Sequence, residues 1–394
     1  MKICMVVSRV PWPLEKGDKL RAYHQLRYLA SKHELHLFCL SDAAVNSEAL
    51  ANLQLITPHV TVYKLNRLKM VVRLCLALFS RKPFQVHYFF DRSIARRLRR
   101  AVDDLAPDVV YCQLIRCSEY VKHWHHYHKV LDYMDALSAG QQRRAKRAPW
   151  YLAPFVREES RRLAAYEHLI VDYFERHCII SEQDRGLIYH PHNSRIQIIP
   201  NGIDSDYFSQ RGSRSVRYDV LFTGNMSYPP NVEGAQRLVL EIMPLVRSRR
   251  PNTSVLLAGA NPTSSVLALA SDTVTVSGWI EDMRTAYNQS GVFVAPMLSG
   301  SGMQNKLLEA MCMELPCVTT SLAATPIGAV HGEHWLIGDS NEELAEAILK
   351  LLDDAEVSAG LGVAARAFVI ERFNWEKTVE LLVETCFNAN DLKS

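Results

Sequence analysis

The sequence contains no long uninterrupted hydrophobic run. Its longest apolar stretch, residues 71–79, is broken by Arg73 and is far shorter than the ~20 residues that span a bilayer. The first seven residues read as a buried strand, whereas a secretory signal needs a basic start, a longer apolar run and a small-residue cleavage site. We therefore expect a cytoplasmic protein without a membrane-spanning segment. Low-complexity stretches and internal repeats are also absent from the sequence.

The nine cysteines lack the spacing of a zinc site or a disulfide scaffold. Cys112 and Cys117 are too far apart for a zinc-binding pair, and so are Cys312 and Cys317. Others, such as Cys39, lie inside apolar runs. An odd number of scattered cysteines is typical of an intracellular protein with reduced thiols. The sequence therefore predicts buried, reduced cysteines.

Charge is distributed unevenly along the chain. Residues 64–100 hold eleven Lys/Arg against one acid, Asp91, which gives this segment +10 and leaves −7 for the rest of the +3 chain. A second basic stretch, residues 143–162, includes Trp150, Tyr151 and Phe155. Apolar residues among the charges of 64–100 are typical of a helix that lies on an anionic membrane surface. The alternative is a solvated face over the core. No recognition motif for nucleic acid accompanies the charge.

At 394 residues the chain has the length of two domains. Short, mostly apolar runs alternate with helical patterns, as expected when strands of a parallel sheet are buried on both faces. In the first half the predicted strands are 2–8, 34–40, 60–65, 108–113, 129–133, 177–181 and 197–199, and the predicted helices include 19–32 and 154–174.

The same pattern restarts after residues 210–217. The predicted strands there are 218–223, 254–258, 274–277, 291–296, 317–320 and 335–337, with helices at 232–248, 283–289, 305–313 and 342–353. The sequence therefore predicts an α/β protein with two doubly wound, Rossmann-like domains that face a central cleft. The expected boundaries are 1–200 and 201–374, followed by an amphipathic helix at 375–394 that packs back on the first domain.

The most specific motif is the segment 299–311, which reads SGSGMQNKLLEAM between a strand and a helix. Glycines let a backbone approach a ligand closely, and the amides of a first helical turn attract an anion. Lys306 adds a charge that suits a diphosphate. Glu309 lies three residues further on, on a similar helix face, where its carboxylate can bind ribose hydroxyls. The alternative is an ordinary glycine loop followed by a solvated Lys and Glu.

Residues 296–320 resemble the donor-binding signature of GT-B glycosyltransferases, specifically the retaining glycosyltransferase family 4 (group 1). That signature has a Glu, seven residues and a second Glu followed by Ala-Met, which Glu309-Ala310-Met311 match. Ser301 stands where the family has its first Glu, which contacts the donor sugar. The form of the whole motif is similar to that of sugar transferases from exopolysaccharide systems.

Three further segments resemble the same family, in the same order along nearly the full chain. They are IPNGID at 199–204, FTGNMSYPPN at 222–231 and SGWIED at 277–282. The resemblance implies that the site for a nucleotide sugar includes Gly17, Asp18, Arg21, Gly224, Asn225, Met226, Gly259, Trp279, Ile280, Ser301, Gly302, Met303, Asn305, Lys306, Leu307 and Glu309.

The N-terminal domain supplies the remaining candidates. In the family, a glycine loop after the first strand faces the acceptor and the donor phosphates, which points to Gly17, Asp18 and Arg21; a surface charge on a helix is the alternative for Arg21. Met134 occupies the place of a family histidine near the anomeric carbon, so Asp135 is the nearest polar candidate for catalysis, beside Lys306 and Glu309. An Asp at a strand end is equally often a helix cap.

Two groups of polar residues resemble metal ligands. Asp204 and Asp206 follow the Pro-Asn-Gly turn, where a turn or capping role is favoured over a cation site. The spacing of a histidine cluster matches no standard zinc site, and a solvated helix end is favoured for its members His123, His125, His126 and His128. The resemblance implies that no metal ion is needed, and we expect no cofactor apart from the nucleotide sugar, which is a substrate.

The sequence therefore predicts a hexosyl-transferring glycosyltransferase of polysaccharide biosynthesis, with a nucleotide-diphosphate-sugar donor and a glycan or lipid-linked acceptor. Its expected location is cytoplasmic, with possible peripheral contact to the membrane through residues 64–100 and no nucleic-acid partner. Two alternatives remain open. One is a sugar-nucleotide epimerase of the same fold, and the other is a non-catalytic binding subunit, which Ser301 and Met134 favour.

Overall fold

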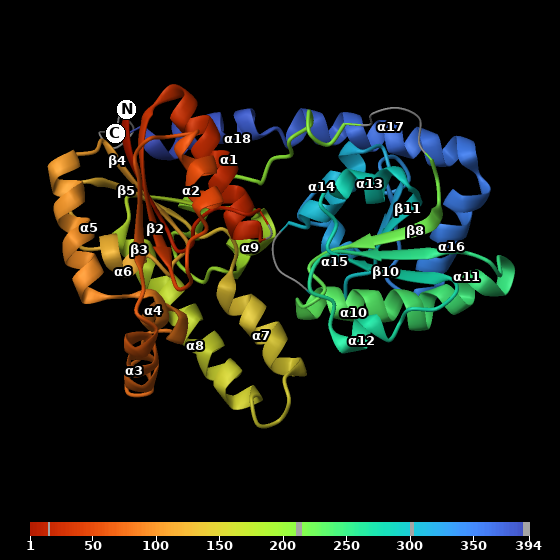
Figure 1. The fold of residues 1–394 in the computed structure, drawn as a ribbon, viewed down its shortest axis with the longest axis horizontal. Helices are drawn as coiled ribbons and strands as arrows, with labels where there is room; N and C mark the ends of the chain where they lie inside the picture. Colours follow the sequence, from red (N-terminus) through yellow and green to blue (C-terminus); the bar gives the residue numbers. More distant parts are fainter. Residues whose placement is uncertain (15, 210–214, 300–302, 389–394) are drawn as a thin grey trace. The chain divides into compact units, whose positions relative to one another are not determined.

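The computed structural model describes residues 1–394 except 15, 210–214, 300–302 and 389–394. The chain divides into two compact units (Figure 1). Unit 1 comprises Met1–Asn201 together with the described part of the segment that begins at Trp375, and unit 2 comprises Gly202–Asn374.

Within its described residues, unit 1 forms a parallel seven-stranded sheet with the order β3-β2-β1-β4-β5-β6-β7. The strands are β1 (Lys2–Val7), β2 (Glu34–Ser41), β3 (Val60–Lys64), β4 (Val109–Gln113), β5 (His128–Asp132), β6 (Arg176–Ile179) and β7 (Gln197–Ile198). Successive side chains of a strand point to opposite faces. Ile3, Met5 and Val7 therefore enter one apolar core, whereas Cys4 and Val6 enter the other. Because both faces of β1 are buried, its sequence is a continuous apolar run.

Helices cover both faces of this sheet (Figure 1). They are α1 (Gly17–Lys32), α2 (Ser47–Gln54), α3 (Arg67–Ala77), α4 (Phe84–Phe89), α5 (Arg92–Leu105), α6 (Ser118–Val121), α7 (Leu137–Arg147), α8 (Ala153–Ile170), α9 (Glu182–Leu187) and α18 (Trp375–Leu382), with short helical turns η1 (Val171–Tyr173), η2 (Asn193–Arg195) and η4 (Val383–Phe387).

Unit 2 contains a parallel six-stranded sheet among its described residues, with the order β10-β9-β8-β11-β12-β13. The strands are β8 (Tyr218–Thr223), β9 (Val255–Ala258), β10 (Val274–Gly278), β11 (Ser290–Ala295), β12 (Cys317–Thr319) and β13 (Leu336–Ile337). Its helices are α10 (Pro229–Arg237), η3 (Leu238–Ile242), α11 (Met243–Arg249), α12 (Ser264–Leu267), α13 (Met283–Asn288), α14 (Asn305–Cys312), α15 (Ser321–Ala324), α16 (Asn341–Asp353) and α17 (Ala355–Arg372).

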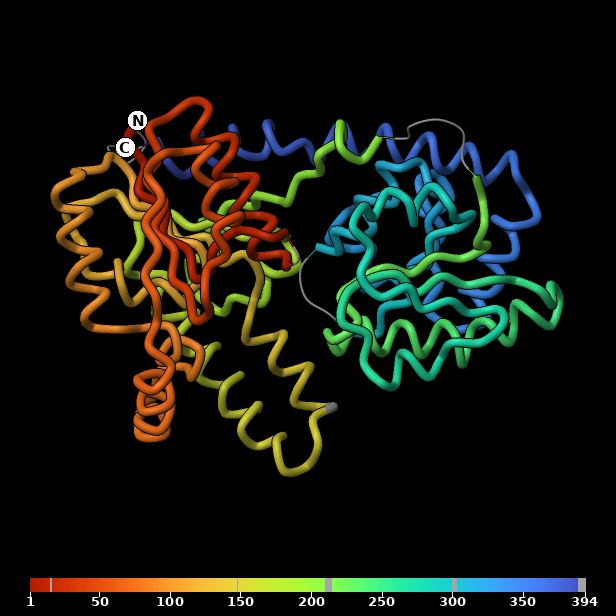
Figure 2. Tube along the Cα trace, viewed as in Figure 1, coloured from red at the N-terminus to blue at the C-terminus, as the bar shows by residue number. Residues whose placement is uncertain are grey.

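The chain enters and leaves unit 2 at neighbouring positions. The backbone N–H of Ile203 donates to the carbonyl of Phe373 at 2.5 Å, and Ile203 forms a parallel bridge with Asn374. After this point α18 packs in unit 1. The ring of Trp375 stacks on His24 of α1 with centroids 4.8 Å apart. The C-terminal helix is therefore part of the first unit, as the course of the tube in Figure 2 shows.

The structure confirms the predicted α/β class with two doubly wound sheets. Every predicted strand is found, with ends that differ by at most two residues. The cysteine prediction is wrong at one position, because Cys75 is exposed on α3 while the other eight thiols are buried and unpaired. No helix in the described part of the chain is both long and apolar enough to cross a membrane.

Candidate functional site

The sheet of unit 2 reverses its strand order next to β8. Strand β9 lies on one side of β8 and β11 lies on the other, and all three run parallel. Ligands of open parallel sheets bind beyond the carboxyl ends of the strands at such a point. Gly224 follows β8, Gly259 follows β9, and the segment after β11 leads to α14. The described part of the predicted motif, which includes the start of α14, therefore lies at the switch point of this sheet.

Lys306 lies in the first turn of α14, half-buried. Its Nζ donates to Oδ1 of Asn231 on α10 at 2.5 Å and lies 4.5 Å from the ring centroid of Phe222. The side-chain amide of Asn231 in turn donates to the carbonyl of Asn225 at 2.9 Å. Burial lowers the pKa of Lys306 to about 7, although Glu309 opposes this shift. A bound anion would restore the charge of this lysine.

Glu309 lies one turn further along α14. Its Oε2 accepts a hydrogen bond of 2.7 Å from the hydroxyl of Tyr287 on α13, which also lies 3.2 Å from Oγ1 of Thr223. Burial raises the pKa of Glu309, while the Tyr287 hydroxyl and the Lys306 charge oppose the shift. Tyr287 therefore holds one of the two carboxylate oxygens of Glu309.

Two glycines allow the ends of β8 and β9 to approach each other. Gly224 and Gly259 have φ angles of +154° and +144°, which side chains disfavour. A Cβ on Gly259 would lie 1.9 Å from the carbonyl oxygen of Gly224, and a Cβ on Gly224 would lie 3.1 Å from Nζ of Lys306. The backbone beside Lys306 can therefore have this course only without side chains.

Unit 1 has a switch point of its own, between β1 and β4. Asp18, in the first turn of α1, accepts a hydrogen bond of 2.6 Å from Nη1 of Arg9 and lies 3.9 Å from Nη1 of Arg116. Arg9 follows β1 and Arg116 follows β4. A Cβ on Gly17 would lie 3.3 Å from Cε of Met134, so the start of α1 adjoins the loop after β5. The guanidinium groups of Arg9 and Arg116 therefore lie beside the Asp18 carboxylate at this edge.

The chain resembles known proteins in sequence and in structure. Residues 217–354 match the family model described as glycosyl transferases, group 1. An "Uncharacterized 44.6 kDa protein in cps region" of Klebsiella pneumoniae is 23% identical over 95% of this chain and 97% of its own length. A GDP-mannose-dependent alpha-(1-6)-phosphatidylinositol monomannoside mannosyltransferase of Mycobacterium tuberculosis is 22% identical over 48% of this chain and 55% of its own length.

Solved structures share the fold over nearly the whole chain. Sucrose-phosphate synthase from Thermosynechococcus elongatus superposes with a TM-score of 0.70 at 14% identity, covering 98% of both chains. Anabaena Alr3699/HepE in complex with UDP and glucose also has a TM-score of 0.70, at 12% identity, covering 98% of this chain and 99% of its own. This protein is a GT-B glycosyltransferase. The predicted fold and enzyme class are thereby confirmed.

The other predicted donor residues of the glycosyltransferase differ in exposure. Met226 and Leu307 are fully buried, so neither presents its side chain to a donor. Trp279 is 62% exposed after β10. Met303 is buried and Asn305 begins α14, whereas Ile280 and Asn225 are half-buried. Ser301 and Gly302 lie outside the described residues.

Arg21 has a different environment from either of those predicted for it. It is not a surface charge, because its side chain and that of Asp132 are both fully buried, with Nε 2.6 Å from Oδ2. Its Nη1 donates to Oδ1 of Asn201 at 2.9 Å, and the Tyr111 hydroxyl donates to the same Asp132 oxygen at 2.5 Å. Burial opposes the charge, but attraction to Asp132 raises the pKa of Arg21 above its usual range. Arg21 therefore binds Asp132 and Asn201 in the interior of unit 1 and does not lie at its surface.

Asp135 is not the helix cap that the sequence allowed. The N-cap position of α7 is Ala136, and the backbone N–H of Ser138 in the first turn donates to Oε1 of Glu167 at 3.0 Å. The backbone N–H of Asp135 donates to the carbonyl of Tyr133 at 2.9 Å. Burial lowers the pKa of Arg116, and the carboxylates of Asp18 and Asp135 oppose this shift. Asp135 therefore belongs to the same edge of unit 1 as Arg116, while Lys306 and Glu309 belong to unit 2.

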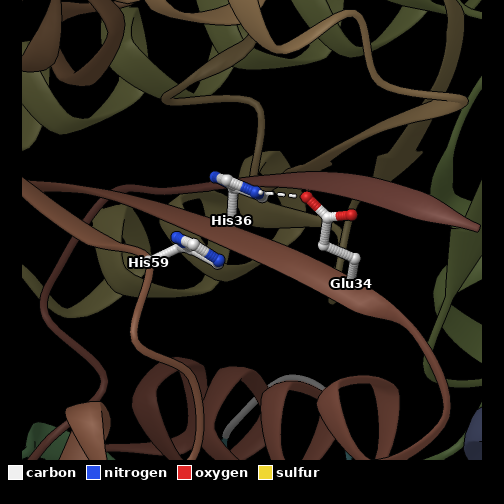
Figure 3. Close-up of side chains that lie close together, drawn as sticks. All are labelled: Glu34, His36 and His59. Carbon is white, nitrogen blue, oxygen red and sulfur yellow. Dashed lines mark hydrogen bonds and ion pairs between the residues drawn. The ribbon is translucent and has the colours of Figure 1, made fainter.

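One group of the described residues has the spacing of metal ligands. Nε2 of His36 lies 3.0 Å from Oε1 of Glu34, and the rings of His36 and His59 stack with centroids 4.0 Å apart (Figure 3). This group lies at the amino end of β2, away from the carboxyl ends that carry the predicted site. The predicted turn role fits Asp204, whose Oδ1 accepts from the backbone of Tyr207 at 3.0 Å.

Replacing Gly259 by alanine should unfold unit 2 at a lower temperature. The new Cβ overlaps the Gly224 carbonyl and the φ of +144° strains any side chain, so we expect a loss of about 2 kcal/mol or more. Thermal unfolding followed by circular dichroism measures it. Gly360→Ala is the control, since Gly360 lies in α17 with open space around its Cβ position. Equal melting temperatures for the two variants would contradict the close approach of β8 and β9.

Proposed function

We propose that this glycosyltransferase moves a hexosyl group from a nucleotide-diphosphate sugar to a glycan or lipid-linked acceptor in polysaccharide biosynthesis. The observation that carries the proposal is the placement of Lys306 and Glu309 on consecutive turns of α14 at the switch point of unit 2. An ammonium group suits a diphosphate and a carboxylate suits the vicinal hydroxyls of a ribose. Because Lys306 and Glu309 are one helical turn apart, they can bind the diphosphate and the ribose of one nucleotide.

The diphosphate would lie against Lys306 and the first turn of α14. A partly desolvated lysine binds an anion more strongly than a solvated one, because the surrounding dielectric is lower. Backbone amides of the turn add to this attraction. In the reaction these groups would stabilise the negative charge of the departing nucleoside diphosphate. We propose that this replaces a divalent cation, so that the transfer is metal-independent.

The ribose would bind Glu309. Tyr287 already donates to Oε2 of this carboxylate and fixes its orientation, which leaves Oε1 to accept from the sugar hydroxyls. We also propose that the anomeric configuration is retained, on the resemblance of residues 296–320 to a retaining family. Asp135 and the arginines of unit 1 would then contact the acceptor.

The arginines at the switch point of unit 1 can bind an anionic acceptor. Arg9 and Arg116 lie beside Asp18, and guanidinium groups bind a phosphate through paired, charge-assisted hydrogen bonds. The names of two relatives, one from a cps region and one a phosphatidylinositol monomannoside mannosyltransferase, also support a polysaccharide or lipid-linked acceptor. We propose in addition that residues 64–100 bring the enzyme to a membrane surface.

Thermal stabilisation by a panel of nucleoside diphosphates and their sugars tests the donor site. One base should stabilise the wild type by about 2.7 kcal/mol at ~100 times its Kd. Glu309→Ala should weaken that binding about 10- to 100-fold, which is the usual effect of losing a charged hydrogen bond. Glu356→Ala, at an exposed position of α17, should bind like the wild type. Failure of every nucleotide to stabilise the wild type would contradict the proposal.

Product analysis separates the remaining alternatives. The epimerase would convert the donor sugar without an acceptor, and a non-catalytic subunit would bind the donor and leave it unchanged with a broad panel of acceptors. The absence of a polar residue at Met134 is the observation that favours the second alternative. Transfer of labelled sugar to an acceptor would exclude both.

A further inference from the structure

Helix α3 turns its apolar stripe toward solvent. Apolar residues recur along it at every third or fourth position, which normally marks the side of a helix that packs on a core. In α3, however, only Met70 and Ala77 are buried. Leu68 is 80% exposed and Phe79, just beyond the helix, is 93% exposed. The exposed members of the stripe are Leu68, Val71, Val72, Cys75, Leu76 and Phe79.

A second exposed apolar group lies where α7 meets α8. Trp150 is 87% exposed, and Tyr151, Leu152 and Phe155 are also exposed. We name residues 148–155 the aromatic tip. Large aromatic side chains are rarely left in water on a monomeric protein without a partner. Trp and Tyr are also the residues that prefer the boundary between lipid and water.

The two groups belong to one part of unit 1. Nη1 of Arg162 on α8 donates to the carbonyl of Ala77 at the end of α3 at 2.6 Å. The carboxylate of Glu159, also on α8, accepts from the backbone of Phe84 at 2.6 Å. Figure 1 shows α3, α7 and α8 extending from the same side of this unit. Contacts at the base of these helices therefore hold the α3 stripe and the aromatic tip together.

Lys and Arg outnumber acids around these apolar groups. Residues 64–90 contain six Lys/Arg and residues 137–157 contain five, and neither segment contains an acid. Arg67 and Lys69 are exposed on α3, and Lys146 and Arg157 are exposed on either side of the aromatic tip. An excess of positive charge around exposed Leu, Val, Phe and Trp is complementary to an anionic lipid surface. A nucleic acid would bind the Lys and Arg side chains but would leave the apolar stripe exposed to water.

We propose that the α3 stripe and the aromatic tip form a single docking surface for anionic phospholipid bilayers. The apolar side chains enter the interface, and the surrounding Lys and Arg side chains bind lipid headgroups. This inference rests on the proposed membrane contact of residues 64–100 and extends it to a second element, α7–α8. It does not depend on which nucleotide or sugar the donor site takes.

Vesicle flotation of the full chain, without nucleotide, tests the docking surface. The wild type should bind vesicles of phosphatidylcholine with 30% phosphatidylglycerol and should bind pure phosphatidylcholine at least tenfold more weakly. Phe79→Glu and Phe155→Glu should each lower binding at least tenfold, since each buries a charge in the interface. Val363→Glu is the control, because Val363 is a 61% exposed apolar residue of α17 in unit 2. Each variant is first checked for a wild-type melting temperature.

The outcomes are distinct. Loss of vesicle binding in Phe79→Glu with normal binding in Phe155→Glu would overturn the single surface in favour of α3 alone. Wild-type binding in both variants, or none in any protein, would overturn the docking surface altogether. A wild-type dimer that Phe79→Glu dissociates would identify a second copy as the occupant instead. Nucleotide stabilisation is measured on the same samples, so failure of the donor site is seen separately.

Discussion

Replacing Lys306 by methionine should lower kcat/KM about 10²- to 10³-fold, which is the usual cost of removing one group that stabilises a developing negative charge. Methionine keeps the length and apolar contacts of the side chain but cannot bind a diphosphate. Asn231, which accepts from Nζ at 2.5 Å, then has no charged partner. Initial rates with the donor identified by thermal stabilisation measure the effect. A loss below threefold would contradict a role for this lysine in binding the diphosphate.

The same lysine should make donor binding depend on pH. Its pKa is lowered to about 7 by burial, so the free protein is charged there below pH 7 and loses the charge as the pH rises. The diphosphate of a nucleotide sugar stays fully ionised through this range, so affinity should fall between pH 7 and 9, by up to tenfold per unit. Lys306→Arg should bind with little pH dependence, because arginine stays protonated. Parallel pH profiles for both proteins would contradict the low pKa.

Removing the carboxylate of Asp132 should destabilise unit 1 by about 3–5 kcal/mol, because Arg21 is then a buried charge without a counter-ion. The two side chains are fully buried with their charged atoms 2.6 Å apart, so no water can replace the lost partner. Asp132→Asn keeps the volume and tests the charge alone. Urea unfolding followed by circular dichroism gives the free energy.

The control for that experiment is an exposed ion pair of the same unit. Arg99 and Asp103 on α5 lie 2.7 Å apart with both side chains accessible to water. Asp103→Asn should therefore cost less than about 1 kcal/mol. A double replacement, Arg21→Met with Asp132→Leu, should recover part of the stability, since it removes both buried charges. Equal losses for Asp132→Asn and Asp103→Asn would show that Arg21 is not confined as the structure places it.

Much of the fold can be predicted because burial on both faces leaves a strong signal. The strand at 218–223 has its predicted bounds, because its central residues Val220, Leu221 and Phe222 are apolar and fully buried. The orientation of α3 could not be predicted. Its period shows an apolar stripe, but the same period is compatible with a stripe that faces the core and with one that faces solvent. Only the packing of Met70 and Ala77 decides between the two.

The candidate site was predicted less completely. The spacing of Lys306 and Glu309 puts both on one helix, which the structure shows as α14. Their partners Asn231 and Tyr287 lie 75 and 22 residues away in the chain, and no local pattern connects them. The buried position of Arg21 was not predicted for the same reason, because its partner Asp132 is 111 residues away in the chain. A charge inside a helical pattern does not reveal which side of the helix holds its counter-ion.

The pairing of Ile203 with Phe373 and Asn374 has a consequence for the history of the chain. Because residues at its start and end pair with each other, unit 2 is a cassette whose two ends meet, although they are more than 170 residues apart in the chain. Recombination that moves residues 202–374 as one piece exchanges the whole donor-side sheet and keeps α18 with its own partner, α1. A crossover at only one of the two points would instead separate α18 from the helix against which Trp375 stacks.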